Sequence, residues 1–356
     1  MQLYTLSYLP LNIELESTMV LKKLTSSHKA LAELKGMSKS IPNQTILINT
    51  LGLQEAKDSS AVENIITTHD DLYKAELKTN NIESLESKEV QNYIEALKKG
   101  FELINNQKLL TNRMIIEIQA TLEKNNAGLR KVPGTTLKNN STGEIIYTPP
   151  QDHQTIMDLM SNLEKYINDN EISDLDPLIK MAIIHFQFES IHPFYDGNGR
   201  TGRIINVLYL VLQNLLDLPI LYLSKFIISN KGDYYKKIQA VRDHKNFEDW
   251  ILFVLEGVEQ TAMDTIQTIT QIQSLLLKQK HQIRKNYKFY SQDLLNNLFK
   301  HPYTKIEFVE QDLKVSRITA ANYLNTLSDD GILTKKKLGV TNYYINPELF
   351  DILSKQ

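Results

Sequence analysis

The chain reads HPFYDGNGRTGR at residues 192–203, and this stretch gathers more chemistry than any other in its 356 residues. Gly197 and Gly199 can bring backbone N–H groups close to a ligand, because glycine adopts positive φ without strain. The apolar run 204–216 follows directly, which predicts that the loop opens into a helix. Unpaired amides and the dipole at the start of a helix favour an anion. The stretch is therefore predicted to hold a phosphate between two helices.

The polar side chains of the same stretch support this interpretation. Arg200 and Arg203 are three residues apart, so they project from one helix face and can clamp phosphate oxygens. Asn198 adds a side-chain donor, and Asp196 suits Mg²⁺ that bridges a carboxylate and a phosphate. His192 suits the acceptance of a hydroxyl proton near neutral pH. A Gly-x-Gly turn or a His-Pro pair alone is more often structural, but their contiguity favours a functional site.

The composition is that of a soluble globular protein, with 42% apolar and 23% charged residues. The net charge of -2 argues against a globally basic nucleic-acid binder, and the absence of cysteine excludes disulfides and thiolate metal sites. No run approaches the ~18 apolar residues of a membrane span, and residues 1–12 lack a signal-peptide pattern. We expect a cytoplasmic protein without membrane contact. Only 13 glycines and many helix-period segments predict a mainly α fold.

Four sections are predicted along the chain: an N-terminal helical segment (1–85), a helical bundle (86–265), a helical linker (266–284) and a C-terminal domain (285–356). Turn residues within 133–150 surround a short β-like run and predict a hairpin. Helical spacing of apolar residues predicts helices over 21–34, 46–56, 90–103 and 110–122, and another that starts at Pro177.

The C-terminal domain has the pattern of a winged helix-turn-helix. Two short helices are predicted over 303–313 and 316–327, followed by two strands within 331–345 around Gly339. Such domains bind DNA or mediate only protein contacts, and both alternatives stay open. The residues that would contact DNA are Arg317, Thr319, Asn322, Lys335, Lys336 and Lys337.

Residues 192–203 resemble the signature of the Fic family, His-x-Phe-x-(Asp/Glu)-Gly-Asn-Gly-Arg-x-x-Arg, at every fixed position. The resemblance implies a Fic helical bundle with a small β-hairpin flap, here followed by a winged helix-turn-helix domain. It also implies an enzyme that uses Mg²⁺ to transfer AMP from ATP to a protein hydroxyl. By this resemblance His192 is the catalytic base and Asp196 holds the metal. The implied ATP-binding residues are Gly197, Asn198, Gly199, Arg200, Thr201, Gly202 and Arg203.

A second motif lies at residues 59–64, SSAVEN. From the residues alone, Ser60 and Glu63 have the spacing of a capping box that starts an ordinary helix. The stretch also resembles the family's inhibitory motif, (Ser/Thr)-x-x-x-Glu-(Gly/Asn), carried here by Ser59, Glu63 and Asn64. The resemblance implies that Glu63 pairs with Arg203 and prevents productive ATP binding. In some relatives the same glutamate aligns a water that removes AMP from the target.

Two further segments resemble parts of the family's substrate site. The hairpin resembles the flap that docks the target backbone by strand pairing. Residues 233–242 resemble the segment beside the adenine, with Tyr235 as the base contact and Ile238 lining the pocket. Some relatives place an asparagine where this chain has Arg242.

The implied partners are a protein that carries a hydroxyl side chain, which includes the chain itself, and a second copy in a homodimer. DNA is a further candidate partner through the C-terminal domain. A de-AMPylase or a transferase of another nucleotide on the same site is one alternative. The other is a DNA-binding regulator whose Fic core senses nucleotides.

Overall fold

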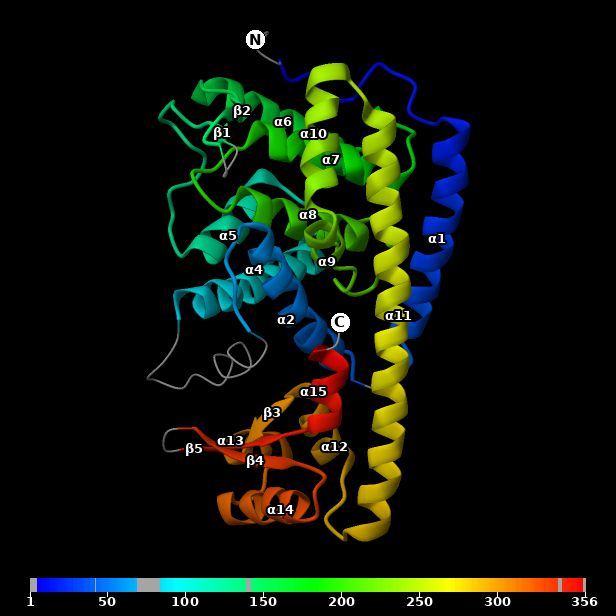
Figure 1. Cartoon of the computed structure of the whole chain (residues 1–356), viewed down its shortest axis with the longest axis vertical. Helices are drawn as coiled ribbons and strands as arrows, with labels where there is room; N and C mark the ends of the chain where they lie inside the picture. The colour runs from blue at the N-terminus through cyan, green and yellow to red at the C-terminus, as the bar shows by residue number, and fades with distance from the viewer. Residues whose placement is uncertain (1–4, 42, 69–83, 139–141, 339–340, 355–356) are drawn as a thin grey trace.

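The computed structural model describes residues 5–41, 43–68, 84–138, 142–338 and 341–354 (Figure 1). Helices make up most of this part of the chain, and its strands form two small antiparallel sheets. The mainly α class predicted from the sequence is therefore confirmed. Within these ranges, none of the helices combines the length and the apolar character that a membrane crossing requires.

The N-terminal part contributes two helices, α1 (Thr18–Ser38) and α2 (Thr45–Val62). Ser17 begins α1, because its hydroxyl accepts the amide of Val20 at 3.3 Å. The buried face of α1 packs along the longest helix of the molecule, α11 (Phe247–Asn286) (Figure 1). α2 lies across the helical bundle, so the N-terminal part covers two different surfaces of that bundle.

The end of α2 differs from the sequence prediction. Ser60 does not cap the start of a new helix, since it lies buried, with Ser59, in the last turn of α2. The capping box between Ser60 and Glu63 is therefore wrong. Glu63 instead caps the C-terminus of the helix, and Asn64 follows with a φ of 66°. Asparagine is enriched in this left-handed conformation, which explains why it can end the helix here.

The helical bundle is built around α7 (Pro177–Ile191), whose residues are apolar around nearly its whole circumference, as in a helix buried on all sides. Asp176 caps α7 by accepting the amide of Leu178 at 2.8 Å, and Pro177 takes the first helical position, as predicted. The helices α6, α8 and α11 pack against α7. The elements of the bundle besides α11 are α4 (Leu85–Gln107), α5 (Asn112–Glu123), α6 (His153–Asn168), η1 (Asn170–Ile172), α7 (Pro177–Ile191), α8 (Asn198–Leu212), α9 (Ser224–Ser229) and α10 (Lys231–His244).

The predicted hairpin is confirmed as two short strands, β1 (Leu137–Lys138) and β2 (Ile145–Tyr147). They pair antiparallel, with Leu137 opposite Tyr147. The Tyr147 hydroxyl donates to the carbonyl of Ser190 at 2.8 Å, near the end of α7. This contact places the hairpin beside the loop that follows α7.

The C-terminal domain has the element order of a winged helix-turn-helix, with strands in the order β3–β5–β4. The helix predicted over 303–313 begins only at Ile306, because the first three residues pair with β5 as a strand. The two predicted wing strands are confirmed, although Gly339 lies outside the described residues. The elements of the domain are α12 (Gln292–Lys300), β3 (Tyr303–Lys305), α13 (Ile306–Leu313), α14 (Arg317–Asp329), β4 (Thr334–Leu338), β5 (Thr341–Ile345) and α15 (Pro347–Ser354).

α11 runs beside both the bundle and the C-terminal domain as one continuous helix of 40 residues (Figure 1). The linker predicted over 266–284 is the C-terminal half of this helix, which continues without a break at residue 265. α2 joins the same two parts by another route. The Gln54 side chain of α2 donates to the carbonyl of Leu353 in α15. The C-terminal domain therefore contacts the helix that ends in the second motif.

Candidate active site

Residues 192–197 form the turn between α7 and α8. His192 ends α7 with a φ of 48°, and its amide donates to the carbonyl of Phe188 at 3.0 Å. Gly197, with a φ of 74°, is the residue from which α8 begins. Because the backbone is left-handed at both His192 and Gly197, the chain reverses its direction within these six residues. The histidine and the N-terminus of the next helix consequently share one tight loop.

Asn198 closes this loop. Its side-chain oxygen accepts the amide of Phe194 and its side-chain nitrogen donates to the carbonyl of the same residue, both at 2.9 Å. Asp196 accepts the amide of Gly197 at 2.7 Å. The side chain of Asn198 therefore fixes the shape of the turn. What the loop offers an anion is the set of backbone amides in the first turn of α8.

His192 is held as a neutral base. Burial lowers the pKa of its imidazole to about 4, and the nearby Arg130 acts in the same direction. The Nδ1 atom of the ring is buried. A neutral imidazole carries one nitrogen that can accept a proton. The ring is therefore in the state that general-base chemistry needs at neutral pH.

Arg130 holds the backbone of the motif loop in place. The sequence alone did not predict this role. Its Nε donates to the carbonyl of His192 at 2.8 Å, and its backbone amide donates to the carbonyl of Pro193 at 2.9 Å. Its Nη2 also donates to the carbonyl of Pro150, at the end of the hairpin segment. The side chain is fully buried. A single arginine in a loop forms no recognisable sequence motif. Its hydrogen bonds to backbone carbonyl groups in the structure show that it positions His192.

Arg203 is occupied by the second motif. Its Nε donates to the Ser59 hydroxyl at 2.8 Å, and its Nη2 donates to the Ser59 carbonyl and to Glu63 Oε1, both at 2.9 Å. Burial alone would raise the pKa of Glu63, but the Arg203 guanidinium outweighs it and holds that pKa below its ordinary value. The carboxylate is thus charged at neutral pH. The structure brings together Ser59, Glu63 and Arg203, as the sequence predicts.

The Glu63 carboxylate also lies over the first turn of α8. A Cβ atom added to Gly199 would collide with Glu63 Oε1, so only glycine fits at this position while the carboxylate is there. The negative group therefore lies beside the first turn of α8, against Gly199. Asn64 supports the same arrangement, since its side-chain oxygen accepts Lys231 Nζ of α10 at 2.9 Å.

Arg200 is held by two carboxylates that the sequence did not reveal. Its Nη1 donates to Glu89 of α4 and its Nη2 to Glu123 at the end of α5, both at 2.8 Å. A Cβ atom at Gly197 would collide with Glu123, so this carboxylate also sits against the turn. Both motif arginines are consequently paired with acidic side chains. These glutamates come from helices far away in the sequence, and a single sequence gives no sign of the pairing.

Thr201 and Gly202 face the interior of the bundle. Thr201 is fully buried, and its hydroxyl has no partner among the described residues. A Cβ atom at Gly202 would lie 2.7 Å from Glu189 Oε1 of α7, so a glycine is required for the two helices to approach. Burial raises the pKa of Glu189 to about 7. In this structure the two positions pack α8 against α7, and Glu189 adds a buried carboxyl group next to Arg203.

The segment 233–242, which is predicted to lie beside the adenine, has exposed and buried side chains. Tyr235 of α10 is 45% exposed, whereas Ile238 belongs to the hydrophobic core. Burial raises the pKa of Tyr235 to about 12, and the Glu63 charge adds to this effect, which places the ring near the site. Arg242 is stacked on Tyr147 with its guanidinium carbon 3.9 Å from the ring centre, and it donates to the Ser190 hydroxyl at 3.1 Å. Arg242 thus joins α10 to the hairpin, and Tyr235 is the residue left facing outward.

Asp196 is the carboxylate available to a metal ion. It is exposed on the loop directly before the first turn of α8. Across the described part of the chain, no three His, Cys, Asp or Glu side chains are grouped closely enough to hold a metal by themselves. Magnesium usually takes one or two carboxylates and completes its shell with substrate phosphates and water. A single aspartate beside the N-terminus of a helix, where a phosphate could bind, is compatible with this mode of coordination.

This fold and site define a mainly helical protein with a histidine-containing turn at the start of a buried helix, and three family models identify it further. Residues 21–102 match the Fic/DOC family N-terminal model, and residues 109–210 match the Fic/DOC family itself. Residues 275–349 match the model of the C-terminal domain of SoFic-like protein adenylyltransferases. The chain belongs to the Fic/DOC family.

Curated relatives match part of the chain. Protein adenylyltransferase fic-1 of Caenorhabditis elegans is 28% identical over 101 residues, which are 27% of this chain and 20% of that protein. Protein adenylyltransferase Fic of Drosophila melanogaster is 29% identical over 150 residues, or 38% of this chain and 30% of that protein. The matched region thus spans less than a third of the length of these relatives.

Solved structures share the fold at low identity. A Fic family protein from Desulfovibrio desulfuricans G20 has a TM-score of 0.60 and 16% identity, over 93% of this chain and 96% of that chain. Fic-1 from Caenorhabditis elegans has a TM-score of 0.53 and 17% identity, over 71% of this chain and 73% of that chain. These likenesses establish the fold.

Proposed function

We propose that this chain is a protein adenylyltransferase that transfers AMP from ATP to a Ser, Thr or Tyr hydroxyl of a protein, including its own chain. The observation that carries the proposal is the neutral His192, which shares one tight turn with the N-terminus of α8. In the reaction the target oxygen attacks the α-phosphorus, and the bond from that phosphorus to the bridging oxygen breaks. Pyrophosphate leaves, and His192 accepts the proton of the attacking hydroxyl.

The chain's own groups would position the triphosphate. The first-turn amides of α8 receive phosphate oxygens, and Arg200 and Arg203 stand on the same helix to neutralise the charge. Asp196 would hold Mg²⁺, which supplies charge neutralisation between phosphate oxygens when bound. Tyr235 is proposed as the adenine contact because it is an exposed ring beside the site, in the segment that resembles the family's adenine-binding part. Positioning and electrostatics thus carry most of the catalysis.

We further propose that the arrangement is autoinhibited. Glu63 occupies both Arg203 and the space above Gly199, so its carboxylate competes with a phosphate for the same donors. A charge-assisted pair of this kind is among the stronger hydrogen bonds in proteins. An ATP molecule that enters must therefore displace Glu63 or bind with its terminal phosphate misplaced, which disfavours attack at the α-phosphorus.

The proposed function is tested by the position of a radioactive label on ATP. With Glu63→Gly protein, α-labelled ATP should label the chain itself or proteins of a cell lysate, and γ-labelled ATP should label neither. Label from the γ position would instead mark a kinase. Label removed from a pre-modified target would favour the de-AMPylase alternative on the same site. A chain that transfers neither label, although it binds ATP, would support the nucleotide-sensing regulator.

The C-terminal domain favours DNA as a second candidate partner. Arg317 and Asn322 of α14 are exposed, as are Lys336 and Lys337 of β4. The acidic pair 329–330 lies at the opposite end of α14, about 18 Å along the helix from Arg317. That distance exceeds the Debye length of about 8 Å at physiological salt, so the acidic pair does little to cancel the basic end.

We expect a salt-dependent affinity for duplex DNA that Lys336→Glu reduces. Loss of one phosphate contact should weaken binding on all sequences and lower the salt slope by about 1. Gel shifts across a range of salt concentrations measure this, and Lys22→Glu, an exposed lysine on α1, is the matched control. Equal binding by both variants, or no salt dependence, would exclude the domain as a DNA reader.

A further inference from the structure

Tyr195 belongs to the motif loop, but the family signature leaves its position open. Its ring is 50% exposed and comes three residues after His192. The hydroxyl oxygen of Tyr195 accepts the amide of Lys131 at 2.9 Å and the amide of Val132 at 3.2 Å. Both amides belong to exposed residues, for which water is the ordinary partner. Tyr195 thus ties a second segment of the backbone to the loop that carries the base.

The amides bound to the motif loop follow one another in the chain. Arg130, directly before Lys131, donates its amide to the carbonyl of Pro193 at 2.9 Å. Three successive amides, those of residues 130–132, therefore donate to the motif loop. This stretch belongs to no helix or strand, so its bonds to the motif loop take the place of a regular element in fixing its position.

The stretch leads into the hairpin of β1 and β2, whose base is joined by one side chain. Gly134 donates its amide to Gln151 Oε1 at 2.6 Å. Gln151 Nε2 donates to the carbonyl of Thr135 at 3.0 Å and to the carbonyl of Pro149 at 2.6 Å. Gln151 therefore connects the chain that enters the hairpin with the chain that leaves it. A position fixed just before Gly134 is consequently transmitted to both strands.

The hairpin has an anchor on each of its two sides. On the side of β2, the Tyr147 hydroxyl holds the carbonyl of Ser190 near the end of α7. On the side of β1, Tyr195 holds the incoming chain. With the first anchor alone the hairpin can pivot about Tyr147. With both anchors the direction of its strand edges is fixed relative to the turn at His192.

We propose that Tyr195 is a positioning residue for the protein substrate, because it sets the hairpin in a fixed orientation relative to His192. The inference rests on the proposed function, with the target backbone docked on the hairpin by strand pairing. The target hydroxyl must then lie within reach of both His192 and the α-phosphorus. A hairpin that pivots presents this hydroxyl out of line, and misplacement of a reacting group lowers the rate of transfer without any loss of ATP binding.

Hydrogen exchange tests the positioning role without any measurement of activity. Tyr195→Phe keeps the ring and removes only the oxygen that accepts the two amides. We expect the amides of residues 131 and 132 and those of β1 and β2 to exchange about threefold to tenfold faster, as for the loss of one ordinary hydrogen bond. If the hairpin amides exchange at the wild-type rate in this variant, Tyr195 does not fix the hairpin.

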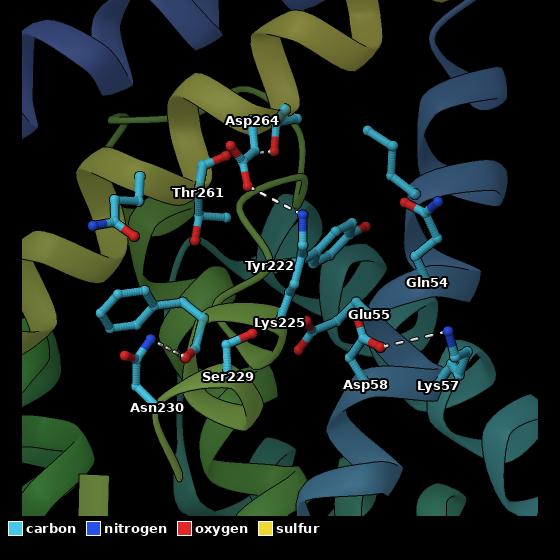
Figure 2. Close-up of a pocket in the computed structure, with 14 residues that line it drawn as sticks. Gln54, Glu55, Lys57, Asp58, Tyr222, Lys225, Ser229, Asn230, Thr261 and Asp264 are labelled. Carbon is cyan, nitrogen blue, oxygen red and sulfur yellow. Dashed lines mark hydrogen bonds and ion pairs between the residues drawn. The ribbon is translucent and has the colours of Figure 1, made fainter. Parts of the chain in front are cut away.

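Tyr222→Phe is the matched control. Tyr222 lines a cavity between α2, α9 and α11, and the hairpin contributes no residue to that cavity (Figure 2). The Tyr222 hydroxyl is buried and has no hydrogen-bond partner among the described residues, so its removal breaks no bond that the structure shows. Exchange in the hairpin should therefore be the same in Tyr222→Phe and in the wild type.

The consequence for catalysis is measured in the Glu63→Gly background, where the inhibitory carboxylate is absent. With α-labelled ATP at saturation, Tyr195→Phe should lower the rate of self-labelling about threefold to tenfold, and Tyr222→Phe should not lower it. The ATP concentration for half-maximal rate should be unchanged in both variants. A full rate in Tyr195→Phe, or a raised half-saturating ATP concentration, overturns the role in substrate positioning. If Glu63→Gly transfers no AMP at all, the proposed function fails, and the exchange measurement still decides whether Tyr195 orients the hairpin.

Discussion

Replacement of Glu63 by glycine is expected to raise the rate of AMP transfer by about tenfold to a hundredfold. The substitution removes the charge-assisted hydrogen bond to Arg203, and bonds to charged groups contribute about 1.5–3 kcal/mol. It also clears the space beside Gly199 in the first turn of α8, which the carboxylate now fills. The backbone tolerates the change, because residue 63 is the C-terminal cap of α2 and glycine is common at helix ends. Incorporation of α-labelled AMP per minute measures the effect.

Glu63→Gln is the matched variant for this prediction. It keeps the length and a hydrogen-bonding oxygen but removes the charge, so the pair with Arg203 should weaken without opening the space above Gly199. We expect a rate between those of the wild type and Glu63→Gly. A Glu63→Gly protein that folds and is no faster than the wild type would show that the carboxylate does not restrain the site.

Loss of the His192 imidazole is expected to lower AMP transfer by about 10²- to 10⁴-fold, the usual contribution of a positioned general base. His192→Asn is the better variant for this test, because residue 192 has a φ of 48° and asparagine accepts that conformation more readily than alanine. The turn should keep its shape, held by Arg130 and Asn198. ATP affinity, measured by titration, should change little, while transfer is lost. Retention of transfer in this variant would assign the base to another group.

The pH dependence follows from the lowered pKa of the same histidine. With a pKa of about 4 the imidazole is neutral throughout the range from pH 6 to 8, so its proton equilibrium should not limit the rate there. Transfer should fall only as the pH drops through about 4, where protonation removes the base. In Glu63→Gly the nearby negative charge is gone, and the pKa of His192 should fall further.

The parts of the site that the sequence predicted are those that lie close together in the chain. The turn from His192 to Gly197 and the helix after it needed only local glycine and apolar patterns. The pairing of Glu63 with Arg203 was reached through a resemblance, since 140 residues separate the two positions.

The parts that were missed depend on distant partners. Glu89 and Glu123 look like ordinary solvated charges on amphipathic helices, yet both hold Arg200. Arg130 looks like a loop arginine and holds the backbone of the motif turn. The capping box predicted at Ser60 and Glu63 was wrong for a related reason: the serines, which suit a helix start, are buried near a helix end, where Ser59 contacts Arg203. Tertiary contacts override local preferences at such positions.

The unbroken course of α11 restricts how this architecture can change in evolution. A helix of 40 residues is about 60 Å long, and each residue inserted into it turns everything beyond by about 100°. One added residue would rotate α15 away from Gln54. Seven added residues, close to two full turns, would restore the rotation about the helix axis but would shift the C-terminal domain along that axis. Insertions in α11 between the catalytic bundle and the C-terminal domain are therefore compatible with the present orientation only when they add close to a whole number of helical turns. Drift in this segment should proceed by substitution, with insertions and deletions confined to the loops on either side.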